Sequence, residues 1–578
     1  MSTQHLAFTV LLVVLAIGGN ACGEQHPIQV DGRDLDWGGV LPAHTDGAGD
    51  AGPSGLDFAG LSVADDARFL FLRLELGIES QLDEGNDLVL YLDTDMNSAT
   101  GLPVRGIGAE LEWRFGSRTG TFHVGGGSTL FHDDLRLRSG PTVSSSWFEV
   151  SIGRDTLPNG AQPLFSGTQV RLILRDEDGA GDELPNTGSV VYTMDQGTAV
   201  PPAPIPLGRQ QASDLRIATY NVHNDSPWDP GEEPRFGRQF SAVDADIWCF
   251  QEIYNHTAAE TASLVGTWVN AGSGAVWSAA DNNDCIVVSR YAILGSWSLS
   301  GNLAVLVDTT AVLGQQLLLI NAHLPCCSNE TGRQDEVDEI LAFVRDAKAS
   351  GGPLTIAADT AIVVVGDLNL VGLSSTLTSL LTGDVADEAT YGADVALDWD
   401  GTGLVNLVSS QTEKRMAYTW RNDNSSFWPG LLDFVIYSDS VVAPANHYVL
   451  YTPEMSSAVL SAAGLQAPDS EASDHLLRVA DLRPQQPPPP KFVRGDCNSD
   501  LIRDISDPAY LLQVLFLGSS APCQSACDTD DDGALTVADA VVSIQALFGL
   551  APQPIAPFPL CATEPTPDLL TCTNSVCP

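Results

Sequence analysis

The chain has 578 residues, with 74 Asp and Glu against 27 Lys and Arg, and a formal net charge of −47. This length predicts roughly two to four domains. Hydrophobic residues make up 44% and charged residues 17%, a balance that fills hydrophobic cores and excludes a wholly disordered chain. The acidity argues against a protein that coats DNA, because neutralising phosphates requires clustered Lys and Arg. It favours binding of divalent cations.

The N-terminus carries an apolar run from Leu6 to Gly19, which is shorter than the about 20 residues needed to span a bilayer. We interpret residues 1–21 as a signal peptide cut between Ala21 and Cys22, and predict a secreted protein, extracellular or periplasmic. A lipoprotein anchored through Cys22 is a less favoured alternative, because Gly19 replaces the usual Leu three residues upstream. An uncleaved anchor is less favoured still. No second transmembrane candidate follows in the sequence.

Two proline-rich segments, residues 201–213 and 483–491, divide the rest of the chain. Such segments form semi-rigid spacers rather than core. They predict three domains, at residues 24–200, 214–482 and 492–578.

Residues 24–200 contain short β-type runs separated by turns rich in Gly and Asp. These runs include Phe69 to Leu76, Leu88 to Leu92, Trp147 to Val150 and Val170 to Leu174. No stretch of helical periodicity intervenes, so we predict an antiparallel β-sandwich. We expect Trp37 and Trp113 to lie in its core rather than to stack on a sugar.

Three short motifs follow one another in this block: Val30-Asp31-Gly32 before Asp36-Trp37, Asp65-Asp66 before a strand, and Asp93-Thr94-Asp95-Met96-Asn97 before Thr100-Gly101. In this order they resemble family-nine carbohydrate-binding modules and DOMON-like domains. The resemblance implies a glycan or other cell-surface ligand. Asp93, Asp95 and Asn97 alternate in a tight turn and offer oxygens to Ca²⁺. The alternative is an ordinary solvated hairpin turn.

In residues 214–482, buried-type strands alternate with amphipathic helices, and polar residues stand at six strand ends. They are Asn221, Gln251-Glu252, His323, Asp367 with Asn369, Asp433, and Asp474-His475. Strand ends gathered on one edge are where α/β enzymes place their active sites. Carboxylates, Asn and His together suit a hard cation and a proton-transfer pair acting on a phosphate.

The block lacks a P-loop glycine pattern, a G-x-S-x-G elbow and an H-E-x-x-H helix. Gly366-Asp367-Leu368-Asn369 followed by Ser473-Asp474-His475, with Asn221 and Gln251-Glu252 upstream, resembles the endonuclease/exonuclease/phosphatase superfamily. That superfamily includes pancreatic-type deoxyribonuclease, abasic-site endonucleases, bacterial sphingomyelinases and inositol-phosphate phosphatases. The resemblance spans residues 214–482 and implies a four-layer α/β sandwich with Mg²⁺-dependent phosphoesterase activity.

The resemblance also implies a metal site. Glu252 would bind the catalytic Mg²⁺, with Asn221 and Asp474 completing its polar shell, in part through water. We expect a structural role for His223 and His256, because neither falls on a motif position.

The resemblance implies catalytic roles for the other motif residues. His475 would transfer the proton next to the scissile phosphate, and Asp433 would hold and polarise it. Asp367 and Asn369 would position the attacking water and a phosphate oxygen. His323 would donate to the non-bridging phosphate oxygens.

The substrate is less constrained by the sequence. Residues 214–482 hold 35 Asp and Glu against 11 Lys and Arg, a difference of −24. We predict a secreted phosphoesterase acting on phosphodiesters or phosphomonoesters, with an extracellular nuclease as one candidate. One alternative is a lipid phosphodiesterase of the sphingomyelinase or phospholipase C type, for which Phe427-Trp428 is a small hint. The other is a non-catalytic carbohydrate-binding or adhesion protein with a relic catalytic domain.

Ten of the eleven cysteines remain when Cys22 is set aside, an even number typical of an oxidising compartment. Six lie in the last 82 residues, where we predict disulfides: Cys497, Cys523, Cys527, Cys561, Cys572 and Cys577. A vicinal disulfide between Cys326 and Cys327 would be strained. We expect bonds from this pair to Cys249 and Cys285, or one such bond with two free thiols.

Residues 492–578 contain an internal repeat with a 32-residue period. Oxygen-bearing side chains stand at loop positions 1, 3, 5, 9 and 12: Asp496, Asn498, Asp500, Asp504 and Asp507, then Asp528, Asp530, Asp532, Thr536 and Asp539. The spacing predicts two EF-hand-type Ca²⁺ loops. The repeat resembles type I dockerins, which implies a small α-helical module and a cohesin-like partner. A Ca²⁺-stabilised tail is the alternative, and Leu501 replaces the turn glycine of the first loop.

Overall fold

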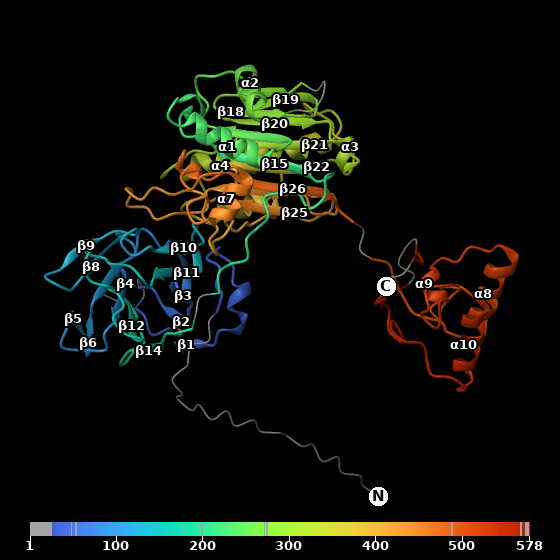
Figure 1. Cartoon of the computed structure of the whole chain (residues 1–578), viewed down its shortest axis with the longest axis horizontal. Helices are drawn as coiled ribbons and strands as arrows, with labels where there is room; N and C mark the ends of the chain where they lie inside the picture. Colours follow the sequence, from blue (N-terminus) through green and yellow to red (C-terminus); the bar gives the residue numbers. More distant parts are fainter. Residues whose placement is uncertain are drawn as a thin grey trace, which may run out of the picture. The chain divides into compact units, whose positions relative to one another are not determined.

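The computed structural model describes residues 26–577 except 48, 53–54, 180, 198–199, 271, 273–275, 487–488, 567–568 and 573–576. The predicted signal peptide and Cys22 lie outside the described residues. The chain divides into two compact units, Met1–Gln485 and Gln486–Pro578 (Figure 1). None of the helices in the described part of the chain is long and apolar enough to cross a membrane.

The first part of the larger unit consists of β-strands and one short 3-10 helix, η1. The elements are η1 Leu35–Gly39, β1 Pro42–Thr45, β2 Phe58–Asp65, β3 Phe69–Ser80, β4 Leu88–Asp93, β5 Leu102–Val104, β6 Ile107–Ala109, β7 Leu111–Arg114, β8 Thr119–Phe122, β9 Ser128–Leu130, β10 Arg138–Gly140, β11 Ser145–Gly153, β12 Gln169–Asp176, β13 Glu183–Leu184 and β14 Val190–Thr193. One antiparallel sheet has the order β1-β2-β3-β11-β10. The second has the order β13-β12-β4-β7-β8-β9, with β14 also paired to β12.

The two sheets enclose one hydrophobic core. Leu72 and Leu74 of β3 contact the same cluster as Leu90 and Leu92 of β4, because alternate residues of each strand face inward. The predicted β-sheet character of this block is confirmed. Trp113 is fully buried and Trp37 is 4% exposed, so the prediction that both lie in a core is also confirmed.

The second part of the larger unit contains two mixed sheets. The strands are β15 Leu215–Asn221, β16 Ile247–Gln251, β17 Ser278–Asn282, β18 Cys285–Ser289, β19 Ile293–Leu299, β20 Asn302–Val307, β21 Leu317–His323, β22 Ala361–Asp367, β23 Val405–Asn406, β24 Asp433–Tyr437, β25 Val442–Val449 and β26 Arg478–Pro484. Their orders are β17-β18-β16-β15-β26-β25 and β19-β20-β21-β22-β24-β23. The pairs β15–β16 and β21–β22 are parallel.

Helices cover the outer faces of both sheets (Figure 1). The helical elements are η2 Ser226–Trp228, α1 Glu233–Val243, α2 Ala258–Trp268, α3 Thr310–Leu313, α4 Glu330–Lys348, α5 Ser375–Thr382, α6 Glu388–Tyr391, α7 Ser457–Ala463 and η3 Asp469–Glu471. Helices α1, α2 and α7 pack on the first sheet, and α4 and α5 on the second. Residues such as Ile217, Val305 and Val363 fill the space between the sheets. The predicted α/β architecture is confirmed, with helices, sheet, sheet and helices in four layers.

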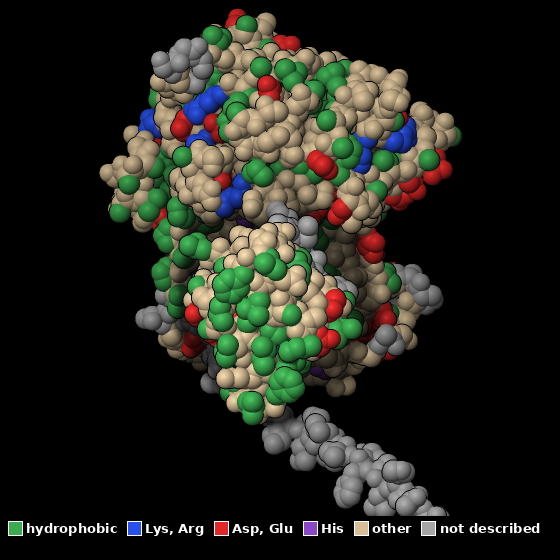
Figure 2. All heavy atoms as spheres, turned by 90° about the vertical axis from the view of Figure 1, so that its right-hand side faces the viewer, with side chains coloured by type: hydrophobic (Ala, Val, Ile, Leu, Met, Phe, Trp, Pro, Cys, Tyr) green, Lys and Arg blue, Asp and Glu red, His purple; other side chains and the backbone are tan. Residues whose placement is uncertain are grey.

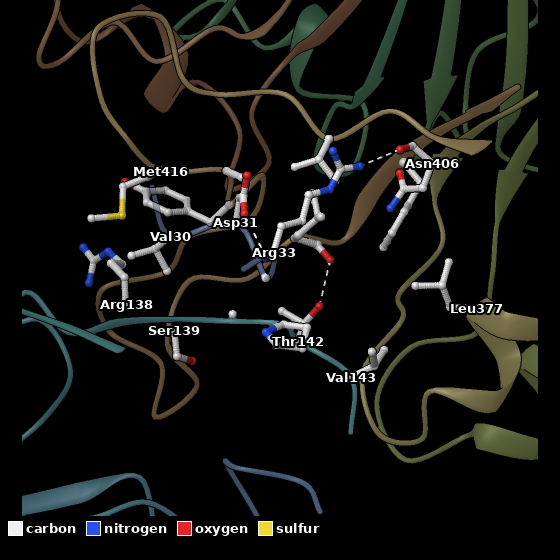
Figure 3. Close-up of a pocket in the computed structure, with 18 residues that line it drawn as sticks. Val30, Asp31, Arg33, Arg138, Ser139, Thr142, Val143, Leu377, Asn406 and Met416 are labelled. Atoms are coloured by element: carbon white, nitrogen blue, oxygen red, sulfur yellow. Dashed lines mark hydrogen bonds between the residues drawn. The ribbon is translucent and has the colours of Figure 1, made fainter. Parts of the chain in front are cut away.

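The β-sandwich and the α/β domain share hydrophobic contacts. Val30, Trp37 and Phe71 of the sandwich pack in one cluster with Met416 and Tyr451. Figure 3 shows a neighbouring part of this junction. There Arg33 Nη2 donates to the Asn406 carbonyl at 2.8 Å, and Thr142 Oγ1 to the Leu431 carbonyl at 3.1 Å.

Phe427 and Trp428, the small hint of a lipid phosphodiesterase, lie at the junction of the two domains. Trp428 is 7% exposed and packs into the sandwich core, with its ring 6.3 Å from that of Trp113. The guanidinium of Arg118 lies 3.7 Å from the centre of the Phe427 ring. Both side chains therefore fasten the two domains together.

The smaller unit holds three helices and a two-stranded sheet among its described residues. They are β27 Lys491–Phe492, α8 Ser506–Leu517, α9 Gln524–Cys527, α10 Val537–Leu547 and β28 Ala562–Thr563. The predicted disulfides in this region are confirmed, as Cys497–Cys527, Cys523–Cys572 and Cys561–Cys577.

The expected bonds from Cys326 and Cys327 to Cys249 and Cys285 are wrong. All four of these described cysteines are free thiols. Cys249 and Cys285 are buried between the two sheets of the α/β domain, on β16 and β18, whereas Cys326 and Cys327 are exposed after β21. A thiol in that core has no path to the exposed loop.

The two acidic loops of the smaller unit have the same backbone hydrogen bonds. Asp496 accepts from the N–H groups of Asp500 and Leu501 at 3.1 and 3.0 Å. Asp528 accepts from Asp532 and Gly533 at 3.3 and 2.9 Å. The sequence repeat is therefore also a structural repeat.

The last acid of each loop follows the same pattern. Asp507 accepts from the N–H groups of Asn498 and Asp504, and Asp539 accepts from those of Thr529 and Thr536. One carboxylate oxygen from each of Asp528, Asp530 and Asp539 lies within 4.8 Å of the other two. The second loop thus gathers three carboxylates around one point.

Candidate active site

Strand register brings the predicted site residues to one edge of the α/β domain. Asn221 pairs with Gln251 across β15 and β16, which places Glu252 at the same edge. His323 pairs with Asp367 across β21 and β22, and Asp367 pairs with Asp433 on β24. The eight residues predicted for catalysis and Mg²⁺ binding therefore converge, and the ten predicted Ca²⁺ ligands lie in the smaller unit.

Gly366 allows this register. Its φ is +133°, and a Cβ atom there would lie 1.9 Å from the Ala322 carbonyl oxygen. Only glycine fits this approach of β22 to β21. Asp367 follows directly and is buried at the strand end.

His475 is held between two buried carboxylates. Its Nδ1 lies 2.9 Å from Asp433 Oδ2, and its Nε2 lies 3.5 Å from Asp367 Oδ2. Burial opposes the charged imidazolium, but Asp433 and Asp367 raise the pKa of His475 to about 10. Burial also raises the pKa of Asp367, against the effect of His475. The geometry fixes the imidazole and gives it two proton-accepting neighbours.

Asn221 connects the two sides of the site. Its Nδ2 donates to Glu252 Oε1 and to Asp367 Oδ2, both at 3.0 Å. Asp474 lies near the same strand end, because Ser473 Oγ donates to the Asn221 carbonyl at 2.9 Å. Glu252 and Asp474 both line one cleft, where their carboxylate oxygens are the hard ligands that Mg²⁺ prefers. The donor set fits a divalent cation.

His323 has a carboxylate partner that the sequence reading missed. Its Nδ1 lies 2.6 Å from Asp284 Oδ2, and Glu252 N–H donates to the same oxygen at 3.0 Å. Burial opposes protonation, but Asp284 and Asp367 raise the pKa of His323. A signal for Asp284 was present: it directly precedes β18, which runs antiparallel to β16, so it starts at the edge where β16 ends.

His223 contacts a residue of the site. Its Nδ1 lies 2.9 Å from Asp474 Oδ1, and its side chain is 52% exposed. Trp420 Nε1 donates to the other oxygen of Asp474 at 3.1 Å. His256 instead stacks on Trp228, with ring centres 3.8 Å apart.

Three polar residues of the site have left-handed backbone conformations. The φ angles of His223, Glu252 and Asn369 are +52°, +64° and +46°. Each costs on the order of 1 kcal/mol for a residue with a Cβ atom. Asn369 is held there by its Nδ2, which donates to the Leu324 carbonyl at 3.1 Å. Such backbone conformations also occur elsewhere in the described chain, so they do not by themselves mark the site.

The site opens into a cleft of about 580 Å³. Glu252, His323, Asp367, Asn369, Asp474 and His475 line it. Its size is in the range of small-molecule sites.

The sequence of this region matches a known family. Residues 218–475 match the Endonuclease/Exonuclease/phosphatase family. These residues form an endonuclease/exonuclease/phosphatase domain. The match begins within β15 and ends at His475, so it includes every site residue described above.

Solved structures similar to this chain come from several organisms. A D. rerio TDP2 complexed with single strand DNA product is 16% identical, covering 47% of this chain and 99% of its own, with a TM-score of 0.30. Sphingomyelinase C from Streptomyces griseocarneus is 17% identical, covering 46% and 99%, with a TM-score of 0.28. A beta toxin mutant from Staphylococcus aureus with bound magnesium ions is 14% identical, covering 46% and 99%, with a TM-score of 0.26. No curated protein matches the chain.

Proposed function

We propose that the chain is a secreted, Mg²⁺-dependent phosphoesterase that hydrolyses its substrate by attack of water. The observation that carries the proposal is the position of His475 between Asp433 and Asp367, next to the Glu252 and Asp474 carboxylates in one cleft. An imidazole, paired carboxylates and oxygen ligands are the groups that hydrolysis of a phosphoester requires.

The chain's own residues handle the proton and the phosphate. Asp433 holds Nδ1 of His475, so that Nε2 faces the cleft and Asp367. Asp367 and Asn369 orient the attacking water and a phosphate oxygen. His323, kept in orientation by Asp284, donates to the non-bridging oxygens as negative charge builds on them.

Glu252, Asp474 and Asn221 would hold the Mg²⁺. When bound, Mg²⁺ neutralises negative charge on the phosphate and the leaving oxygen. The hydrogen bonds from Asn221 Nδ2 to Glu252 and from Trp420 Nε1 to Asp474 orient both carboxylates.

The test is hydrolysis of bis(p-nitrophenyl) phosphate by the purified chain with Mg²⁺, with EDTA, and after His475→Ala. We expect activity that EDTA and the substitution both abolish. If the wild-type chain is inert towards small phosphoesters, DNA and sphingomyelin alike, the proposal fails. Glycan binding without hydrolysis would then favour the adhesion alternative.

We also propose that Ca²⁺ binds both loops of the smaller unit. The support is the shared hydrogen-bond pattern and the three convergent carboxylates of the second loop.

Hydrophobic side chains are exposed on α8 and α10 and just after α10, including Phe516, Leu517, Val541 and Phe548, and Figure 2 shows many on the surface of this unit. They support a cohesin-like partner. The disulfides are compatible with an oxidising compartment and so with secretion.

We also propose a Ca²⁺ site in the β-sandwich. The sequence predicts Asp93, Asp95 and Asn97 as its ligands, but Glu110 rather than Asn97 lies beside the two aspartates. One oxygen of each of Asp93, Asp95 and Glu110 lies within 4.8 Å of the others. Asp93 Oδ1 and Glu110 Oε1 are buried and lack a hydrogen-bond partner among the described residues. A cation would satisfy both.

Ca²⁺ should raise the melting temperature of the larger unit, and Glu110→Gln should remove that increase. A melting temperature that does not change with Ca²⁺ would contradict the site.

A further inference from the structure

The cleft over the catalytic residues has a second wall, which the β-sandwich supplies. Leu82, Asp83, Ser139, Thr142 and Phe148 line the same cleft as His475 and Glu252. These residues come from the loop after β3, from β10 with the segment that follows it, and from β11. A substrate in the cleft therefore contacts two domains.

The wall is fixed to the catalytic side by direct contacts. The Ser144 N–H donates to the Gly372 carbonyl at 2.6 Å, three residues beyond Asn369. Trp428, five residues before Asp433, is embedded in the sandwich core. The wall is thus part of the site rather than a neighbouring surface.

The charge of the cleft is unusual for a site that receives phosphates. Among the described residues that line it, none is Lys or Arg, whereas five are carboxylates: Asp83, Glu252, Asp284, Asp367 and Asp474. Arg118 lies close by but is paired with Asp83 at 3.4 Å and with Glu84 at 3.0 Å. One phosphate held by a cation and the two imidazoles is compatible with this charge. Further phosphates of a polynucleotide would face these carboxylates, with no Lys or Arg among the described lining residues to offset the repulsion.

The sandwich side of the cleft is mainly apolar. Phe427 is 45% exposed on this side, and Leu82, Phe148, Trp428 and Leu432 lie almost fully buried behind the surface of the cleft. Desolvating such a surface favours an uncharged organic group next to the phosphate. The volume of about 580 Å³ accommodates a compact ligand.

We propose that the β-sandwich wall makes the enzyme selective for compact phosphoesters that carry one phosphate and an uncharged or cationic organic group. Asp83 and Phe427 act as specificity-determining residues, and polynucleotides are disfavoured. This inference rests on the proposed phosphoesterase function and names its substrate class.

The test compares kcat/KM for bis(p-nitrophenyl) phosphate with that for a ten-residue oligothymidylate, each with Mg²⁺, in the full chain. We expect the small diester to be preferred. Asp83→Asn should shift the ratio about fivefold towards the oligonucleotide, because it removes one repulsive charge. Asp87→Asn is the matched control: this residue is exposed, lies four positions away and does not line the cleft, so the ratio should not change.

Two further substrates test whether the natural substrate is a dissolved ester or a lipid. They are p-nitrophenyl phosphorylcholine in solution, and sphingomyelin in phosphatidylcholine vesicles. Hydrolysis of the first alone indicates a dissolved ester, and hydrolysis of the second indicates a lipid headgroup; either supports the proposal. Preference of the wild-type chain for the oligonucleotide overturns it. So does an unchanged ratio in folded Asp83→Asn.

A binding measurement separates this proposal from the catalytic one. Calorimetric titration of His475→Ala with bis(p-nitrophenyl) phosphate and Mg²⁺ reports recognition without turnover. Adding Phe427→Ala, a 45% exposed side chain, should weaken binding about fivefold. If Phe427→Ala leaves binding unchanged, the role of the wall is overturned, even if hydrolysis is never observed. If the wild-type enzyme binds the ester but does not hydrolyse it, only the catalytic proposal is contradicted.

Discussion

The candidate active site and the acidic loops of the smaller unit both gather carboxylates, but the charges are balanced in different ways. At the active site, Asp433, Asp284 and Asp474 each pair with an imidazole. In the loops of the smaller unit, Asp507 and Asp539 accept hydrogen bonds from backbone N–H groups and lie near other carboxylates. Burial raises the pKa of Asp507 to about 6 and that of Asp539 to about 7. We therefore expect the candidate active site to keep its shape without a cation, and the loops to depend on the Ca²⁺ proposed for them.

The largest expected effect is on the rate of catalysis at the candidate active site, where carboxylates pair with imidazoles. His475→Gln keeps a polar side chain of similar size but removes the proton-transfer group. We expect kcat to fall by about 10³-fold. Steady-state kinetics measure the loss, and circular dichroism checks that the fold is retained. A loss below tenfold in folded protein would mean that another group transfers the proton.

The next largest effect is on the stability of the smaller unit, whose loop carboxylates lie close to one another. Ca²⁺ removal should lower the melting temperature of the smaller unit by about 10 °C or more, because binding stabilises only the folded loops. Calorimetry of the full chain should resolve it as one of two transitions, since the chain has two compact units. Activity with Mg²⁺ should be unchanged. A single transition that ignores Ca²⁺ would show that disulfides alone stabilise this unit.

A smaller effect is expected from a residue that acts through His323. Asp284→Asn keeps a hydrogen-bonding side chain but removes the charge beside Nδ1, so the imidazole loses its fixed orientation. We expect kcat to fall about tenfold with little change in KM. The control is Asp359→Asn, at an exposed position just before β22, at the opposite end of that strand from Asp367. Equal effects of both substitutions would contradict the positioning role.

Several strand ends of the candidate site could be predicted from the sequence because they follow an apolar run that must be buried. Asn221 and Asp367 are of this kind, whereas Asp433 opens its strand and is predicted through the family resemblance; strand pairing then brings the three together. Asp284 also precedes its strand but belongs to no motif, so the sequence does not single it out. His223 follows its strand but falls on no motif position.

The sandwich wall could not be predicted from the sequence. Asp83 and Phe148 are separated from His475 by more than 300 residues and carry no local signal of a site. Their place in the cleft depends on how Trp428 and Val30 pack between domains, a long-range contact with no periodicity in either segment. Local patterns predict the elements and the chemistry, whereas the shape of the cleft follows from tertiary packing.

The smallest expected effect compares the two loops with each other. Leu501 has a φ of +66°, where the second loop has Gly533 at +79°. A leucine in this conformation costs on the order of 1 kcal/mol relative to glycine, so the first loop should bind Ca²⁺ more weakly. Leu501→Gly should raise the affinity of that loop up to about fivefold, measured by calorimetric titration of the full chain with Ca²⁺. Ile502→Gly is the control, because Ile502 is similarly exposed but its φ is not positive, so glycine there should give no gain. If Leu501→Gly also leaves the affinity unchanged, backbone strain is not what separates the two loops. The difference must then come from their ligands, Asn498 against Asp530 at position 3 and Asp504 against Thr536 at position 9.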